Sequence, residues 1–193
     1  MLYRIVRDIL KPFFYLIYNI RVEGRENLPE KGPLIICANH TNVIDPIILA
    51  VSLPYNINSM AKAELFKNKL FAFFLNKIGV FPVKRGEADI KSIKTSLKLL
   101  KENKVMGIFP EGTRNKTGEL KAEPGVAMIA IRAGSPVLPI AIVGNYKLFH
   151  RTVVKIGKPV LMDKYSNQKL QNEDYQNISM DIMKYINKLL KDD

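Results

Sequence analysis

His40 and Asp45, five positions apart, are the residues of this 193-residue chain whose types and spacing could do base chemistry. A carboxylate that accepts a hydrogen bond from one imidazole nitrogen fixes the tautomer and makes the other nitrogen more basic. Such a nitrogen can take the proton of an alcohol, as acyl transfer to a hydroxyl requires. The alternatives are that His40 is a structural loop histidine and that Asp45 is only a helix cap.

The sequence around this pair predicts a strand, a turn and a helix start. Residues 33–38 are apolar and predict a short buried strand that ends just before His40. Asp followed by Pro46 is a favoured helix beginning. We therefore expect Asp45 to cap a helix from Pro46 and His40 to fold back over the carboxylate. No Gly-x-Ser-x-Gly segment occurs, so the acceptor hydroxyl is expected to attack directly, without an acyl-enzyme.

A second polar segment, Phe109-Pro110-Glu111-Gly112-Thr113-Arg114, follows an expected strand at 105–109. Arg114 can bind a phosphate through two hydrogen bonds, and Gly112 allows the backbone to approach a ligand closely. Glu111 can accept a hydrogen bond from a substrate hydroxyl or brace an arginine, and Thr113 lies between these candidates for substrate contact. The alternative is a plain turn with a surface ion pair.

A third segment ends in two adjacent cations, Lys84 and Arg85, directly after an expected strand at 80–83. One or both could hold a phosphate, because ligands gather at the carboxyl ends of strands in open α/β sheets. The alternative is a solvated basic turn.

Hydrophobic periodicity predicts strands that alternate with helices. This pattern indicates a single α/β domain with a central, largely parallel or mixed sheet flanked by helices. The expected strands are 33–38, 57–61, 80–83, 105–109, 137–143 and 153–156, and the expected helices are 46–53, 65–78, 90–103, 124–133 and 178–189.

The N-terminal segment predicts an amphipathic helix over residues 2–20, with Pro12 as a kink or a boundary. It is an interfacial membrane anchor or, alternatively, a helix packed on the domain with a solvated basic face. Residues 65–78 also combine lysines with phenylalanines, which suits a membrane interface or, alternatively, the core. No apolar window of about 20 residues predicts a transmembrane helix, and no cleavage signature predicts a signal peptide.

The composition limits the partners and the metal chemistry. Lys and Arg number 30 against 18 Asp and Glu, a net charge of +12 that favours anionic partners such as nucleic acid, a membrane surface or a phosphorylated substrate. No nucleic-acid-binding motif is recognised, so that class is disfavoured. With two histidines and one cysteine, Cys37, the sequence does not favour a zinc site, and no intrachain disulfide is possible. We expect Cys37 to be buried and His150 to be a surface or structural residue.

The polar segments, in this order, resemble the conserved blocks of the glycerolipid acyltransferase family, in particular bacterial 1-acyl-glycerol-3-phosphate acyltransferases. The segment at 109–114 resembles the third block in full. The other blocks are matched by the His-x4-Asp pair, by residues 79–85 and by residues 137–140.

The resemblance implies transfer of an acyl group from acyl-CoA or acyl carrier protein to the sn-2 hydroxyl of 1-acyl-glycerol 3-phosphate, giving phosphatidic acid. It implies His40 as base, Asp45 as its partner, Arg85 and Arg114 on the phosphate, and Glu111 and Gly112 on the glycerol part. No cofactor or metal ion is implied. The protein would act at the cytoplasmic face of the membrane, peripherally or monotopically, with residues 1–22 as the interface helix and 23–193 as the acyltransferase domain.

Two choices stay open at this point. The acceptor could instead be glycerol 3-phosphate or another lysophospholipid, and the chain could be a non-catalytic basic module that binds membrane or nucleic acid. The family pattern also departs here at Asn42, at Asn115 and around Lys121, a candidate phosphate ligand separated from Gly125 by Ala-Glu-Pro.

Overall fold

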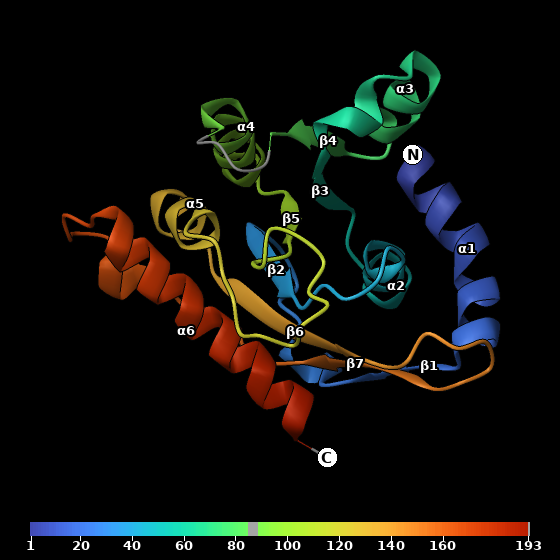
Figure 1. Cartoon of the computed structure of the whole chain (residues 1–193). Helices are drawn as coiled ribbons and strands as arrows, with labels where there is room; N and C mark the ends of the chain where they lie inside the picture. Colours follow the sequence, from blue (N-terminus) through green and yellow to red (C-terminus); the bar gives the residue numbers. More distant parts are fainter. Residues whose placement is uncertain (85–88, 193) are drawn as a thin grey trace.

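A seven-stranded sheet forms the centre of the computed structural model, which describes residues 1–84 and 89–192 (Figure 1). The strand order is β1-β7-β6-β2-β5-β3-β4, and the pairs are parallel except for β6 with β7. The expected α/β class with a largely parallel, mixed sheet is therefore confirmed. The strands are β1 (Ile20–Glu23), β2 (Leu34–Ala38), β3 (Ile57–Lys62), β4 (Val80–Val83), β5 (Val105–Ile108), β6 (Val137–Val143) and β7 (Thr152–Ile156).

Helices cover both faces of the sheet (Figure 1). Alternate residues of β2 show the division: Leu34 and Ile36 pack with the side chains of α1 and α2, whereas Ile35 and Cys37 pack with those of α4, α5 and α6. This alternation is the period of a strand buried on both sides. The helices are α1 (Leu2–Tyr18), α2 (Asp45–Ser52), α3 (Lys69–Lys77), α4 (Ile90–Lys101), α5 (Gly125–Ala133) and α6 (Asn172–Lys191).

The register of the central strands decides where the polar segments lie. In β2, Cys37 is opposite Ile108 of β5, and Ala38 is opposite Ile140 of β6. Because β2 runs parallel to both neighbours, its carboxyl end lies beside theirs. The segment that begins at Asn39 therefore meets the segment that begins at Phe109, 70 residues later in the chain.

The N-terminal helix differs from the prediction in its end. It stops at Tyr18 because Asn19 adopts a left-handed conformation, with φ 41°, and Ile20 then begins β1, an edge strand that pairs with β7. The expected helix over 2–20 was thus two residues too long, and β1 was missed. The helix continues through Pro12, so of the two expectations for this residue, a kink or a boundary, the boundary is excluded.

A second correction concerns the expected helix at 65–78. Residues Ala63–Phe66 form a separate 3-10 turn, and α3 begins only at Lys69. The side chain of Asn68 accepts a hydrogen bond from the backbone N–H of Phe71 at 3.1 Å and caps the new helix. Among the described residues, no helix is both long and apolar enough to cross a membrane.

Candidate active site

His40 and Asp45 form the hydrogen-bonded pair that the sequence predicted. The Nδ1–H of His40 donates to Oδ2 of Asp45 at 2.9 Å. Asp45 is fully buried and His40 is 9% exposed, so this pair is largely shielded from water. Since a carboxylate can only accept here, Nδ1 carries the proton and Nε2 is left with a free lone pair. The arrangement can accept a proton from a hydroxyl in the adjoining groove.

Asp45 does not cap α2, contrary to the prediction. The N-cap residue is Ile44, and Asp45 is the first residue of the helix, with no side-chain bond to the helix backbone. Its Oδ2 turns back to the preceding loop instead, where it accepts the backbone N–H groups of Thr41 and Asn42, each at 2.8 Å. The carboxylate therefore shapes the turn that carries His40, and the start of α2 adds a favourable dipole for its charge.

The backbone of His40 is held from both sides by the segment after β5. Its N–H donates to Oε2 of Glu111 at 2.7 Å, and its carbonyl oxygen accepts the backbone N–H of Asn115 at 2.7 Å. Asn115 was noted from the sequence only as a departure from the family pattern. Its backbone N–H binds His40, and its side chain shapes the following turn, where it accepts the N–H groups of Thr117 and Gly118.

Two aromatic or amide side chains fix the surroundings of the imidazole. The Phe109 ring stacks on the His40 ring, with centroids 4.1 Å apart and planes 22° apart. The amide of Asn39 donates to the carbonyl of Ile142 at 3.0 Å and accepts its N–H at 2.7 Å, so it extends the pairing of β2 with β6 by one side chain. The sequence placed Phe109 in a polar segment but predicted a role for neither residue.

Tyr146 is a further member of the site that the sequence did not predict. Its hydroxyl donates to Oδ1 of Asp45 and accepts from Oγ1 of Thr41 at 3.0 Å. The residue comes from the segment between β6 and β7, 101 positions after Asp45. A contact over that separation leaves no local pattern that could have revealed it.

The predicted substrate-binding residues divide into three groups. Glu111, Gly112, Thr113 and Lys84 line the same groove as His40. Arg114 is exposed and does not line the groove, and Lys121 is exposed and lies 3.4 Å from Glu123 in an ion pair. Arg85 falls outside the described residues. The role of each in binding substrate stays a prediction.

Gly112 has a reason to be glycine that the structure makes specific. Its φ is +68°, a left-handed conformation, and a Cβ there would lie 2.8 Å from Cγ of Glu123. The backbone N–H of Glu123 donates to the carbonyl of Pro110 at 2.7 Å, so the two segments are held together. The glycine lets the chain turn tightly beneath Glu123 while Glu111 points inward to His40.

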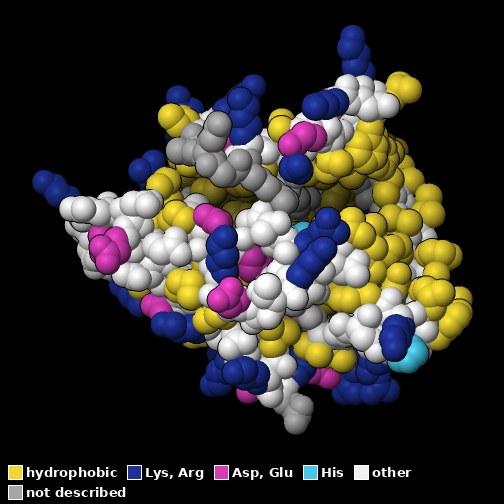
Figure 2. Space-filling view, viewed as in Figure 1, with side chains coloured by type: hydrophobic (Ala, Val, Ile, Leu, Met, Phe, Trp, Pro, Cys, Tyr) yellow, Lys and Arg dark blue, Asp and Glu magenta, His cyan; other side chains and the backbone are white. Residues whose placement is uncertain are grey.

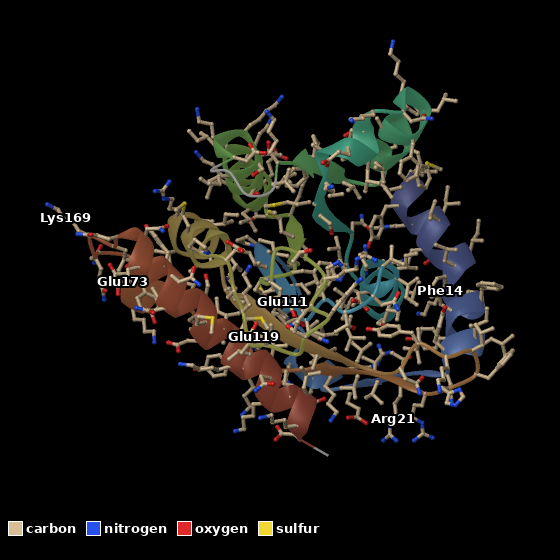
Figure 3. All side chains as sticks on the ribbon, viewed as in Figure 1. Phe14, Arg21, Glu111, Glu119, Lys169 and Glu173 are labelled. Carbon is tan, nitrogen blue, oxygen red and sulfur yellow. The ribbon has the colours of Figure 1, made fainter. Side chains whose placement is uncertain are left out.

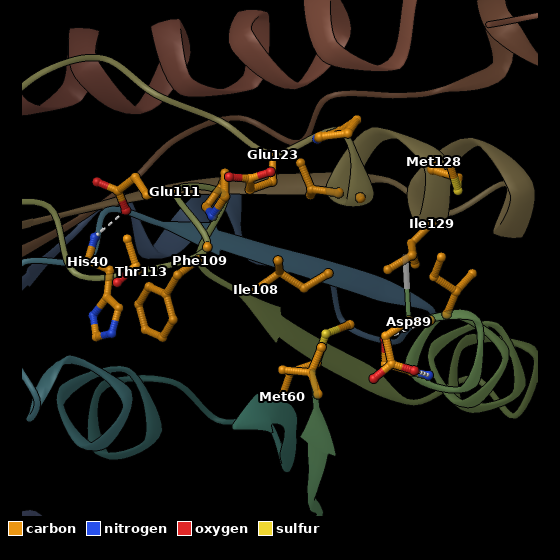
Figure 4. Close-up of a pocket in the computed structure, with 18 of the residues that line it drawn as sticks. His40, Met60, Asp89, Ile108, Phe109, Glu111, Thr113, Glu123, Met128 and Ile129 are labelled. Atoms are coloured by element: carbon orange, nitrogen blue, oxygen red, sulfur yellow. Dashed lines mark hydrogen bonds between the residues drawn. The ribbon is translucent and has the colours of Figure 1, made fainter. Parts of the chain in front are cut away.

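The groove has a volume of about 490 Å³ and runs from His40 and Phe109 at one end to Met128 and Asp89 at the other (Figure 4). Between these ends its lining is mostly apolar and comes from β3, β4, β5, α4 and α5. The apolar side chains of this lining are Met60, Val83, Ile93, Ile108, Val126, Met128 and Ile129. A groove of this kind can hold an alkyl chain whose polar end lies at His40.

The comparisons with known proteins agree with this geometry. A family model described as acyltransferase matches residues 19–143, which is more than half of the chain. The chain belongs to the acyltransferase family. It is therefore an enzyme that transfers acyl groups.

Several relatives carry one name, 1-acyl-sn-glycerol-3-phosphate acyltransferase. The protein of Bacillus subtilis is 39% identical over 165 residues, which cover 82% of each chain. That of Borreliella burgdorferi is 30% identical over 142 residues, which cover 70% of this chain and 55% of the relative. In fold, the chain is similar to the crystal structure of the Thermotoga maritima enzyme PlsC, with a TM-score of 0.73, 23% identity, and coverage of 98% of this chain and 82% of that one.

Glu111 is 3% exposed and lies near the centre of the molecule (Figure 3). Burial raises the pKa of this carboxyl from 4.5 to about 7, helped by the charge of Asp45 and opposed by the hydrogen bond from His40. Between these two values the folded protein holds a proton that the unfolded chain has lost. The contribution of Glu111 to stability is thus complete below pH 4.5 and declines as the pH rises to about 7.

Replacing Glu111 by Gln should remove this dependence, because Gln is neutral at every pH and can still accept the N–H of His40. We expect the unfolding free energy of the wild type, minus that of Glu111→Gln, to fall between pH 5 and pH 7 by on the order of 2 kcal/mol. Urea titrations of both proteins at pH 5, 6, 7 and 8 measure it. The control is Glu119→Gln, at an exposed side chain of the loop after Arg114. A difference that stays constant with pH would contradict the assignment.

Proposed function

We propose that this protein acylates the free hydroxyl of a 1-acyl-glycerol 3-phosphate and so makes phosphatidic acid. The observation that carries the proposal is the buried His40–Asp45 hydrogen bond, which leaves Nε2 of His40 as a free base at the polar end of an apolar groove. The names of the relatives support the choice of acceptor. The transfer itself agrees with the family to which the chain belongs.

The chemistry follows from the pair. Nε2 of His40 takes the proton of the acceptor hydroxyl as its oxygen attacks the thioester carbonyl of the donor. The tetrahedral intermediate then collapses: the carbon–sulfur bond breaks, and the departing thiolate receives the proton from the imidazolium. Asp45 stabilises the imidazolium between these steps and keeps the ring in one tautomer. The thioester donor is acyl-CoA or acyl carrier protein. These bond changes need no metal ion and no cofactor.

The acceptor phosphate requires cations that face the groove or its His40 end. Lys84 lines the groove at the Asp89 end, where its backbone N–H donates to that carboxylate at 2.9 Å. Arg114 extends from the segment that holds the backbone of His40. We propose these two, together with Arg85, as the phosphate ligands, since Arg and Lys both bind phosphate strongly. Lys121 is the weaker candidate, because its ammonium already faces Glu123.

His40→Ala should abolish most of the activity while leaving the fold intact. Asp45 loses the hydrogen bond from the ring in this variant, but it keeps its two backbone donors and the hydroxyl of Tyr146. We expect kcat with lysophosphatidate and acyl-CoA or acyl carrier protein to fall by roughly 10²- to 10⁴-fold. The matched control is His150→Ala, at the second histidine, which is exposed on the segment between β6 and β7. Unchanged turnover in His40→Ala would disprove the mechanism. No turnover by the wild type would disprove the assignment of lysophosphatidate as the acceptor.

We also propose that the enzyme works while resting on the cytoplasmic face of the membrane. Hydrophobic side chains cover the side of the molecule formed by α1 and α3 (right in Figure 2). On α1 they form a stripe that points away from the core, and Leu16 is 72% exposed; on α3, Phe73 is 64% exposed. We call this surface the apolar face, and its members are Leu2, Ile5, Ile9, Phe13, Leu16, Leu70, Phe71, Phe73, Phe74, Leu148 and Phe149.

Support for this placement comes from the apolar side chains of α1, some of which face the core and others of which face outward. Phe14 is buried against the core and Leu10 packs on the same cluster, whereas Ile9, Phe13 and Leu16 face outward. The helix is therefore packed on the domain and amphipathic toward the outside as well. A patch of this kind, bordered by lysines, suits an interface with anionic lipid.

Liposome flotation tests the membrane proposal. The triple variant Ile9→Ser, Leu16→Ser, Phe73→Ser removes apolar area from exposed side chains, so it should bind vesicles less without loss of stability. The matched control is Leu161→Ser, which removes an equally exposed leucine from a loop outside the apolar face. We expect the wild type and the control to float, with more recovered on anionic than on neutral vesicles. Equal flotation of the triple variant would refute the proposal.

A further inference from the structure

The two oxygens of Asp45 have different partners. Oδ2 accepts the Nδ1–H of His40 and the backbone N–H groups of Thr41 and Asn42. Among the hydrogen bonds of the described residues, Oδ1 has one partner, the hydroxyl of Tyr146, which donates to it over a short distance. The orientation of the carboxylate therefore depends on Tyr146 on one side and on the catalytic loop on the other.

The hydroxyl of Tyr146 is suited to be a permanent donor. Burial, and next the hydrogen bond to Asp45, raise the pKa of Tyr146 well above its usual value. The phenol therefore keeps its proton at neutral pH and donates it to Oδ1 of Asp45. Because Asp45 is fully buried, an Oδ1 without this donor would lack a hydrogen bond in the protein interior, which is unfavourable for a charged group.

The backbone around Tyr146 holds the ring in place. Tyr146 has a left-handed conformation, with φ 57°, and the side chain of Asn145 accepts the N–H of Lys147 at 3.1 Å. Three residues further, the N–H of Phe149 donates to the carbonyl of Ile17 at 2.6 Å and so attaches the segment to the end of α1. The ring itself packs on the core cluster of β2, β6 and α2. Tyr146 is thus fixed by the scaffold and does not depend on Asp45 to find its position.

We propose that Tyr146 is a positioning residue for acyl transfer, which holds Asp45 in the rotation that keeps Oδ2 on His40 and Nε2 available as base. The residue transfers no proton in the reaction. It acts through Asp45 and does not contact the substrate. The inference rests on the function proposed above and adds a third side chain to the catalytic pair.

Tyr146→Phe tests it, because this change removes the hydroxyl and retains the ring. We expect kcat to fall by about tenfold, with little change in KM for lysophosphatidate. The acidic limb of the profile of kcat/KM against pH should also move to lower pH, because an Asp45 carboxylate that can rotate off His40 stabilises the imidazolium less. The ionisable groups facing His40 are Asp45 and Glu111, and both are the same in the two proteins. Wild-type kcat, or a limb that stays in place, would overturn the proposal.

A matched control and a double variant separate positioning from packing. Tyr18→Phe removes a hydroxyl from a tyrosine that packs on the same core cluster, and it should change neither kcat nor the pH profile. In a background of Asp45→Asn, Tyr146→Phe should cause little further loss, because the carboxylate that it orients is gone. Losses that multiply in the double variant would mean that Tyr146 acts elsewhere. Unchanged turnover in His40→Ala, by contrast, would overturn the proposed function itself.

Discussion

A buried negative charge, the carboxylate of Asp45, is the constraint on which the rest of the site depends. With no exposure to water, it must be satisfied by donors from the protein, and four from the described part of the chain reach it. Three come from residues 40–42 and therefore force the loop after β2 to curl over the start of α2. The fourth, from Tyr146, comes from the segment between β6 and β7. The position of His40 is one result of meeting this requirement.

The second requirement, under the proposed mechanism, is that the imidazole keeps its position while its outer nitrogen takes the proton. The backbone of His40 is bound through both its N–H and its carbonyl to residues 111 and 115, and its ring is stacked on Phe109. These contacts are possible because β2 and β5 are parallel neighbours whose carboxyl ends coincide. The third sequence block thus supports the base directly, in addition to any contact it makes with substrate. Glu111 combines both tasks, since it lines the groove and accepts the N–H of His40.

Local patterns in the sequence were enough to predict the α/β class, most of the elements and the His40–Asp45 pair. They failed where the deciding contact is distant or where one pattern continues into another. Ile20 continues the apolar repeat of α1, so β1 could not be separated from the helix without its partner β7. Asp45 has the sequence of a cap, but its stronger donors lie in the loop before it. Tyr146 joins the site across 101 residues and has no local signal at all.

The apolar face and the catalytic pair are connected by one short segment of chain. Leu148 and Phe149 belong to the apolar face, Phe149 is hydrogen-bonded to the end of α1, and Tyr146 of the same segment binds Asp45. A lysophospholipid carries its reactive hydroxyl just above the level of its acyl chain in the bilayer. An enzyme that acylates it must therefore hold its base close to the lipid surface. In this fold three residues separate Tyr146, which binds Asp45, from Phe149 on the apolar face, an arrangement that suits the proposed placement at a membrane.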